Sequence, residues 1–193
     1  MIMVSMTSAG GTRRAASEDG PAGLRSRIWN IAATVRDPEL PMLTLADLGI
    51  LRDVELTGSS ASVVITPTYS GCPALVTMRA DLLHRLAEHG FGDVRITVRL
   101  DPPWTTDWIS EHGSAELRRA GISAPGPRSA GSAAGRNPAG VIPVRLGPTR
   151  RMLSCPRCGC DDVALVSEFG STACQAHYRC RNCREPFEHI KEI

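Results

Sequence analysis

The chain has 193 residues, of which 22 are lysine or arginine and 20 are aspartate or glutamate, so its formal net charge is +2. This balance excludes a general electrostatic attraction to nucleic acid or to a membrane surface. No run of about 18 apolar residues occurs, which excludes an ordinary transmembrane helix. Residues 1–20 lack the charged start and apolar run of a secretory signal, so we expect a cytoplasmic protein.

A chain of this length can hold one full domain and a smaller one, and composition divides it into four parts. Residues 1–22 are predicted to be a disordered N-terminus, and residues 23–121 a folded domain. Residues 122–150 are dominated by Gly, Ala, Pro and Ser, as is typical of a flexible linker. Four arginines and no acidic residue lie there. We interpret the stretch as a solvated linker, with contact to an acidic partner or to nucleic acid as the alternative. Residues 151–193 form the second domain.

Hydrophobic patterning predicts the elements of residues 23–121 in chain order. Apolar residues at helical spacing predict a helix at about 23–36, which Asp37-Pro38 ends. Alternating residues predict strands at 50–56 and 61–66, joined by a turn. A long amphipathic helix then ends at Gly90, a third strand covers 93–100, and short helical segments follow between 104 and 120.

The order α-β-β-α-β indicates a small α+β fold with helices on one face of a three-stranded sheet. If the second and third strands pair in parallel, the crossover between them should be right-handed.

Two C-x-x-C pairs near the C-terminus predict a metal site, and 21 residues separate them. Each pair places two thiolates on a tight turn, and two such turns make a closed tetrahedral S₄ site for structural Zn²⁺. About 40 residues are too few for a self-sufficient apolar core, so metal binding should supply most of their folding free energy. The predicted ligands are Cys155, Cys158, Cys180 and Cys183.

Other interpretations of this region stay open. Iron is a less favoured metal, and disulfides or redox-active C-x-x-C motifs are alternatives, although nothing indicates an oxidising compartment. Residues that compete as ligands are Cys160, Cys174, His177 and His189. Strands are expected at 163–168 and 176–179, with Phe169, Tyr178 and Phe187 as the small apolar cluster of a zinc ribbon.

Cys72 is the candidate reactive residue of the first domain. It lies in Gly71-Cys72-Pro73, and proline is favoured at the first position of a helix. That places Cys72 at or near an N-cap, where the helix dipole stabilises an anion and lowers the pKa of a thiol. The structural alternative is a half-buried thiol that only fills space. His84, His89 and His112 are not placed to activate it, so a cysteine hydrolase is a minor hypothesis.

Acidic residues bracket the segment between the first helix and the first strand. Asp37, Glu39 and Asp47 offer carboxylates that could bind a hard cation or act as acid and base. The simpler interpretation gives Asp47 the cap of a turn and Gly49 a positive φ.

These motifs resemble those of a known family. Residues 24–121, with Asp37-Pro38-Glu39, Asp47-Leu48-Gly49 and Thr66-Pro67-Thr68 leading to Gly71-Cys72-Pro73, resemble the iron–sulfur assembly domain of SufT-like proteins. Together with the ribbon and its stretch from Phe169 to Cys174, the chain is similar to the PaaD (PaaJ) family, whose members are encoded with the aerobic phenylacetyl-CoA epoxidase. The long, low-complexity linker is the main departure.

The resemblance implies an accessory, non-catalytic subunit that helps assemble or maintain the iron–sulfur centre of the epoxidase system, with its reductase component as the expected partner. Cys72 would handle iron or a transient cluster, Asp37, Glu39 and Asp47 would be its acidic loop positions, and the four ribbon cysteines would bind zinc. A single thiol cannot hold a cluster, so a homodimer, a partner cysteine or glutathione must complete the site. The alternative is a non-catalytic adaptor that docks through the ribbon.

Overall fold

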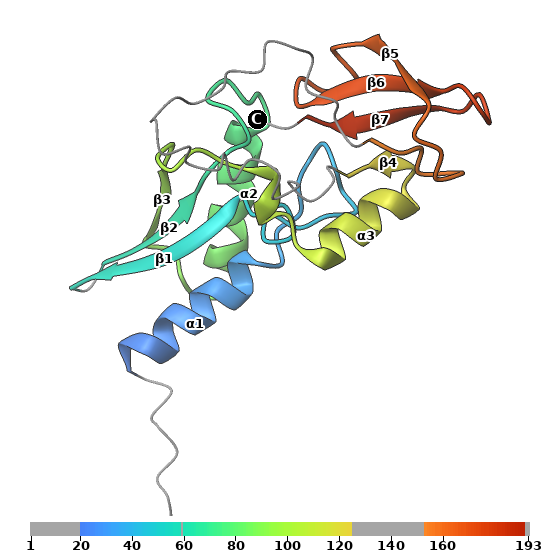
Figure 1. The fold of residues 1–193 in the computed structure, drawn as a ribbon. Helices are drawn as coiled ribbons and strands as arrows, with labels where there is room; N and C mark the ends of the chain where they lie inside the picture. The colour runs from blue at the N-terminus through green and yellow to red at the C-terminus, as the bar shows by residue number, and fades with distance from the viewer. Residues whose placement is uncertain (1–19, 59, 125–152, 192–193) are drawn as a thin grey trace, which may run out of the picture.

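The computed structural model describes residues 20–58, 60–124 and 153–191. Along the chain these residues form a domain that ends with α3 (Glu111–Arg119), followed by a strand β4 and a C-terminal ribbon (Figure 1). The predicted disordered N-terminus therefore lies outside the described residues except for its last three positions. Most of the predicted linker also lies outside them.

A three-stranded sheet with the order β1-β2-β3 forms the centre of the first domain. Strand β1 (Leu51–Thr57) pairs antiparallel with β2 (Ser60–Ile65), so the predicted hairpin is confirmed. Strand β3 (Val94–Val98) pairs with β2 in parallel. Helix α2 (Leu75–Glu88) makes the crossover between them, and the predicted α-β-β-α-β order is therefore confirmed.

Both long helices pack on the sheet and on each other, as expected for a layer of helices on one face. Met78, Leu82 and Leu86 are buried at intervals of four along α2, which is the helical period. Helix α1 (Pro21–Ala32) ends four residues before the expected position. The reason is local: Arg36 forms an isolated bridge with Thr44, which requires extended backbone there. Among the described residues, no helix has the length and apolar character needed to cross a bilayer.

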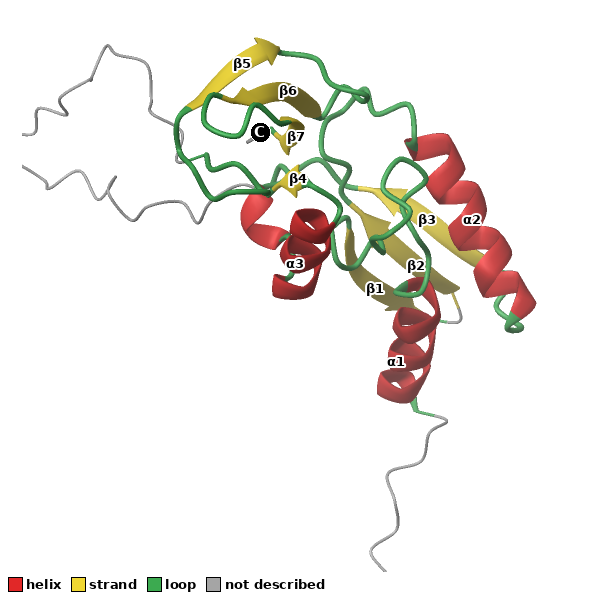
Figure 2. Cartoon of the chain, turned by 90° about the vertical axis from the view of Figure 1, so that its right-hand side faces the viewer, coloured by secondary structure: helices red, strands yellow, loops and turns green. Residues whose placement is uncertain are grey.

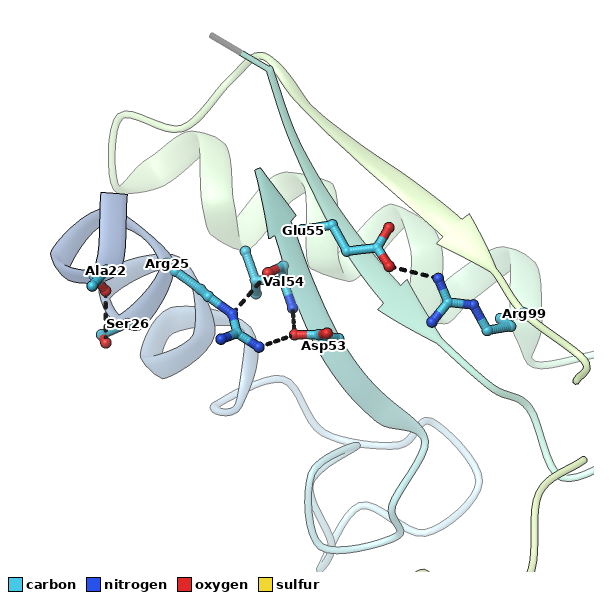
Figure 3. Close-up of polar contacts among 7 residues, drawn as sticks. All are labelled: Ala22, Arg25, Ser26, Asp53, Val54, Glu55 and Arg99. Carbon is cyan, nitrogen blue, oxygen red and sulfur yellow. Dashed lines mark hydrogen bonds and ion pairs between the residues drawn. The ribbon is translucent and has the colours of Figure 1, made fainter. Parts of the chain in front are cut away.

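Arg25 connects α1 to the neighbouring strand (Figure 3). Its Nε donates to the carbonyl of Val54 at 2.9 Å, and its guanidinium pairs with Asp53. Arg99 pairs with Glu55 in the same way, 2.6 Å apart. Since these side chains are partly exposed to solvent, their ion pairs orient the elements and contribute little free energy.

The C-terminal ribbon is built from β5 (Val163–Ser167), β6 (Gln175–Cys180) and β7 (Pro186–Ile190). Strands β5 and β6 match the expected positions, whereas β7 was not predicted. The sheet order is β4-β7-β6-β5, where β4 is Ile122–Ser123 (Figure 2). The first two residues assigned to the linker are therefore a strand, because they pair in parallel with Glu188 and His189 of β7.

Pairing through β4 joins the ribbon to the first domain. Ile122 and Ile190 belong to the same buried cluster as the core of the first domain. The ribbon has its own smaller cluster, in which the rings of Tyr178 and Phe187 stack 6.1 Å apart. Phe169 was expected there but is 72% exposed, and Lys191 Nζ lies 4.8 Å from the centre of its ring.

Candidate functional site

The four predicted zinc ligands lie on two tight turns at one end of the ribbon. In the first turn, the N–H of Gly159 donates to the carbonyl of Cys155 at 2.8 Å, and Gly159 has a φ of 71°. In the second, the N–H of Cys180 donates to the carbonyl of Glu185 at 2.9 Å, and Arg184 has a φ of 62°. Both turns use a residue in the left-handed region to fold the chain sharply behind the second cysteine.

Their sulfur atoms have the geometry of a tetrahedral site. All four lie within 4.8 Å of one another, and the Sγ atoms of Cys155 and Cys183 are 3.7 Å apart. The Sγ atoms of Cys158 and Cys180 are 3.6 Å apart. A tetrahedron with Zn–S bonds of about 2.3 Å has S···S edges of about 3.8 Å, so the residues fit zinc.

Electrostatics also call for a cation between these thiols. The backbone N–H of Cys160 and then the thiol of Cys183 lower the pKa of Cys158 to about 6. A hydrogen bond from the N–H of Glu185 lowers the pKa of Cys183, but desolvation and the three other thiols raise it to about 12. The four sulfurs therefore do not all ionise together unless a cation compensates them.

Among the described residues, the four predicted cysteines form the group of three or more ligand atoms that lie close enough together to hold one metal ion. Cys160, Cys174, His177 and His189 are not part of this group of ligand atoms. The sulfur of Cys160 instead accepts a hydrogen bond from the N–H of Asp162 at 3.4 Å. A metal ion held by all four cysteines would have no open coordination position, as is typical of structural zinc sites.

Cys72 lies in the loop between β2 and α2, two residues before the N-cap of the helix, which is Ala74. The N–H of Cys72 donates to the carbonyl of Tyr69, and the N–H of Leu75 donates to the carbonyl of Cys72. Because of these two successive turns, α2 begins only at Leu75. Cys72 therefore lies near the N-cap of α2, which is one of the two expected placements, and not at it.

A small cavity of about 20 Å³ lies beside Cys72. Its polar lining is Thr68 and four acidic groups, those of Asp37, Glu39, Cys72 and Cys174. The rest is apolar and comes from both domains: Leu40, Leu48, Ile50, Met78, Trp104 and Ile190. A volume of this size holds one water molecule or one metal ion.

The two carboxylates of the cavity come from the loop after α1. Asp37 is 5% exposed, and its Oδ1 accepts hydrogen bonds from the N–H groups of Glu39 and Leu40 at 2.9 and 2.8 Å. Burial raises the pKa of Asp37 more than these hydrogen bonds lower it. Desolvation and the charge of Asp37 raise the pKa of Glu39. The structure thus brings two of the three predicted acidic residues to Cys72.

The environment of Cys72 differs from the expectation drawn from the sequence. Burial raises its pKa above the ordinary 9.0, and a hydrogen bond from the N–H of Ala74 offsets this only in part. The negative charges of Glu39, Cys174 and Asp37 raise it further. The thiol is therefore protonated at neutral pH unless a cation enters the cavity, and the expected low pKa is wrong.

Asp47, the third predicted acidic residue, lies outside the cavity lining. Its Oδ2 accepts from the hydroxyl of Thr44 at 2.6 Å, and its Oδ1 accepts from the hydroxyl of Ser110 at 3.0 Å. Burial alone would raise the pKa of Asp47, but the hydrogen bonds from Thr44 and Ser110 outweigh it and lower the pKa. These contacts support the simpler interpretation, in which Asp47 fixes a turn against α3.

Hydrolase chemistry at Cys72 finds no support in the cavity, because none of its lining residues is a histidine. His84 instead lies 3.3 Å from Glu88 on the exposed side of α2. Sequence reasoning did not place Cys174 and Trp104 at this site. The one available signal was that Cys174 was a cysteine without a place in the zinc tetrad.

Family comparisons agree with both halves of the molecule. Residues 25–98 match the family model described as iron–sulfur cluster assembly protein, and residues 142–191 match the PaaD zinc beta ribbon domain. A relative from Escherichia coli (strain K12), provisionally named as the D component of 1,2-phenylacetyl-CoA epoxidase, is 41% identical over 166 residues, or 86% of this chain and 92% of the relative. The chain belongs to the PaaD family. It joins an iron–sulfur assembly domain to a PaaD zinc ribbon.

Other proteins resemble about half of this PaaD-family chain. The Fe-S protein maturation auxiliary factor of Porphyromonas gingivalis (strain ATCC BAA-308 / W83) is 31% identical over 92 residues, or 47% of this chain and 87% of that relative. A solved structure from Bacillus anthracis, described as domain of unknown function DUF59, has a TM-score of 0.46 and 23% identity. It covers 50% of this chain and 92% of the solved chain.

Proposed function

We propose that this chain is a non-catalytic maturation subunit of the phenylacetyl-CoA epoxidase system in the cytoplasm. Its cargo is iron or an iron–sulfur cluster for the reductase component, and Cys72 is the residue that contacts this cargo. The observation that carries the proposal is the meeting of Cys72, Asp37 and Glu39 at one cavity within the domain that matches iron–sulfur assembly proteins.

The chemistry of the cavity fits a cation as cargo. A thiol and two carboxylates with raised pKa values line a small, largely apolar space. A cation that enters it removes the mutual repulsion of these groups and favours loss of the thiol proton. Since the cavity has little space for an organic substrate, the arrangement supports metal handling over turnover of a metabolite.

The test is maturation of the reductase component in cells that also express this chain. With Cys72→Ser we expect the iron and acid-labile sulfide content of the purified reductase to fall at least ~10-fold, as for loss of a metal-site residue. Cys160→Ser is the matched control, because it makes the same Cys-to-Ser change at a thiol outside both the zinc tetrad and the cavity. Normal cluster content with Cys72→Ser would contradict the proposal.

An adaptor role is the second candidate, and the edge of the ribbon favours it. Leu165 and Val166 on the terminal strand β5 are 45% and 61% exposed, and Phe169 beyond it is 72% exposed. If docking is the whole function, Val166→Asp should abolish co-purification with the epoxidase components while Cys72→Ser leaves maturation intact.

A further inference from the structure

We propose that Cys174 of the ribbon is the second thiol ligand of the Cys72 site, and that the two sulfurs hold a single divalent cation of the softness of Fe²⁺ between the two domains. This inference rests on the proposed function, since it names the ligand that one thiol alone would lack. The observation behind it is that Cys72 and Cys174 line the same cavity from different domains, together with Asp37 and Glu39.

The ribbon holds Cys174 in place through several contacts. Its carbonyl accepts from the N–H of Lys191 at 2.9 Å, and its sulfur lies 3.1 Å from the hydroxyl of Thr172. The neighbouring Ile190 is 3% exposed and belongs to the core of the first domain. Because β7 also pairs with β4, the loop that carries Cys174 is fixed against the Cys72 domain from two sides.

The negative charges around the cavity favour binding of a cation by the two cysteines. Burial raises the pKa of both Cys72 and Cys174, the negative charges of Glu39 and Asp37 raise both further, and the charge of Cys174 also raises that of Cys72. Two thiolates with carboxylate oxygen nearby form a donor set that suits iron, cobalt or zinc better than magnesium or calcium.

Binding balances without any change of oxidation state. Two S–H bonds break and two sulfur–metal bonds form, while two protons pass to the solvent. The cation keeps its charge of +2 throughout, so the step needs no oxidant or reductant.

The size of the cavity decides between an ion and a cluster. About 20 Å³ accommodates a particle the size of one water molecule, whereas the smallest cluster contains two metal ions and two sulfides. No three ligand atoms of this cavity lie as close together as those of the zinc tetrad, whose four sulfurs are within 4.8 Å of one another.

Cobalt titration of the zinc-loaded full chain under anaerobic conditions tests the inference. Co²⁺ reports thiolate ligands through sulfur-to-metal charge-transfer absorption, and it does not readily displace Zn²⁺ from a tetrathiolate site because zinc binds more tightly. We expect one Co²⁺ per chain beyond the zinc. Cys72→Ser and Cys174→Ser should each weaken its binding at least ~10-fold and reduce the charge-transfer band. Cys160→Ser should bind as the wild type does.

The outcomes separate this inference from the proposed function. Cobalt binding that falls with Cys72→Ser but not with Cys174→Ser overturns the inference and leaves the proposed function standing. Wild-type binding in both variants overturns the inference and removes the physical support for Cys72. Zinc content and circular dichroism of each variant show whether it is folded.

A second measurement needs no variant. Dibromobimane becomes fluorescent only when both of its arms have reacted with thiols, and the zinc-bound cysteines are protected. We expect a cross-link between Cys72 and Cys174, identified by peptide mass spectrometry in the wild-type protein. Two singly modified thiols without a cross-link would overturn the inference.

Discussion

Burial is the main cause of the raised pKa of Cys72, and groups that lie far from it in the sequence raise it further. Glu39 and Asp37 belong to the loop after α1, and Cys174 belongs to the ribbon, yet all three raise the pKa of this thiol. Because its pKa is raised, Cys72 is predominantly a neutral thiol at pH 7. Under the proposed function, cargo binding would therefore drive deprotonation of Cys72.

Alkylation kinetics check this charge state. In the metal-free cavity, iodoacetamide should modify Cys72 slowly at pH 7, with a rate that still rises above pH 9. Glu39→Gln removes a negative neighbour, lowers the pKa toward its ordinary value and should accelerate the reaction at pH 8. Glu88→Gln on the exposed side of α2 is the control and should change nothing. A rate that already levels off below pH 8 would show an acidic thiol instead.

Asp37 and Asp47 should respond to neutralisation with opposite signs. The folded-state pKa of Asp37 is raised, so its ionisation opposes folding, and Asp37→Asn should stabilise the protein at pH 7. This gain should shrink as the pH falls through the raised pKa and vanish below about 3.8. The folded-state pKa of Asp47 is lowered, so Asp47→Asn should cost about 1–2 kcal/mol at pH 7.

Urea denaturation at pH 7 and pH 5 of the zinc-bound protein measures both effects. The loss caused by Asp47→Asn should persist at pH 5, because the stabilisation by Asp47 disappears only below the unfolded value of 3.8 and through its lowered folded pKa. Changes of the same sign in both variants would contradict the assignment of Asp37 to a site and Asp47 to a turn.

At the scale of single elements, the turn into β1 depends on Gly49. Its φ is 66°, and a Cβ added there would lie 2.5 Å from the carbonyl oxygen of Trp108. Gly90, after α2, has a φ of 84° but open space around it. Comparing substitutions of the two glycines therefore distinguishes the cost of backbone strain alone from the added cost of a steric clash.

Gly90→Ala should cost about 1–2 kcal/mol, the penalty of a left-handed conformation for alanine. Gly49→Ala should cost clearly more, because the backbone of Trp108 must also move. Thermal unfolding of both variants measures the difference. Equal costs would indicate that the segment around Trp108 yields freely and does not fix the turn.

Several elements could be predicted from the sequence because their signals are local. Helix α2 follows from apolar residues four apart, and the zinc tetrad follows from two C-x-x-C pairs. Strand β7 was missed because Pro186 begins it and its pattern is short. The start of α2 was predicted too early, because Gly71-Cys72-Pro73 form turns that precede the helix. Nothing in those three residues distinguishes a turn from an N-cap.

The approach of Cys174 to Cys72 could not be predicted, because it depends on tertiary packing. The two residues belong to different domains, and the contact requires two-residue pairing of β4 with β7 and burial of Ile190. The same packing places Asp37 and Glu39 at the thiol and reverses the pKa expected from the helix dipole. The sequence thus identified Cys72 as a candidate, whereas the structure gave the direction of its pKa shift.

For the whole molecule, removal of zinc should affect the first domain as well as the ribbon. We expect about one zinc per chain, and chelation should unfold the ribbon because the metal supplies most of its folding free energy. All three tryptophans lie in the first domain, and Trp104 lines the cavity that Cys174 and Ile190 help to close. Loss of the ribbon should therefore shift tryptophan fluorescence to longer wavelength.

Fluorescence spectra before and after chelation check this coupling, and added zinc should reverse the shift. Trp104→Phe is the control variant and should lose most of the change. Unaltered emission after complete loss of zinc would show that the two domains do not depend on each other.

The parallel pairing of β4 with β7 also has a consequence for synthesis. A ribosome completes the first domain well before it has made β7, so the growing polypeptide displays Leu48, Ile50 and Trp104 without their cover from Ile190. Until β7 has been synthesised, the nascent protein exposes this apolar patch to solvent. Fragments that stop before the ribbon should consequently depend on chaperones and precipitate more readily than the full chain.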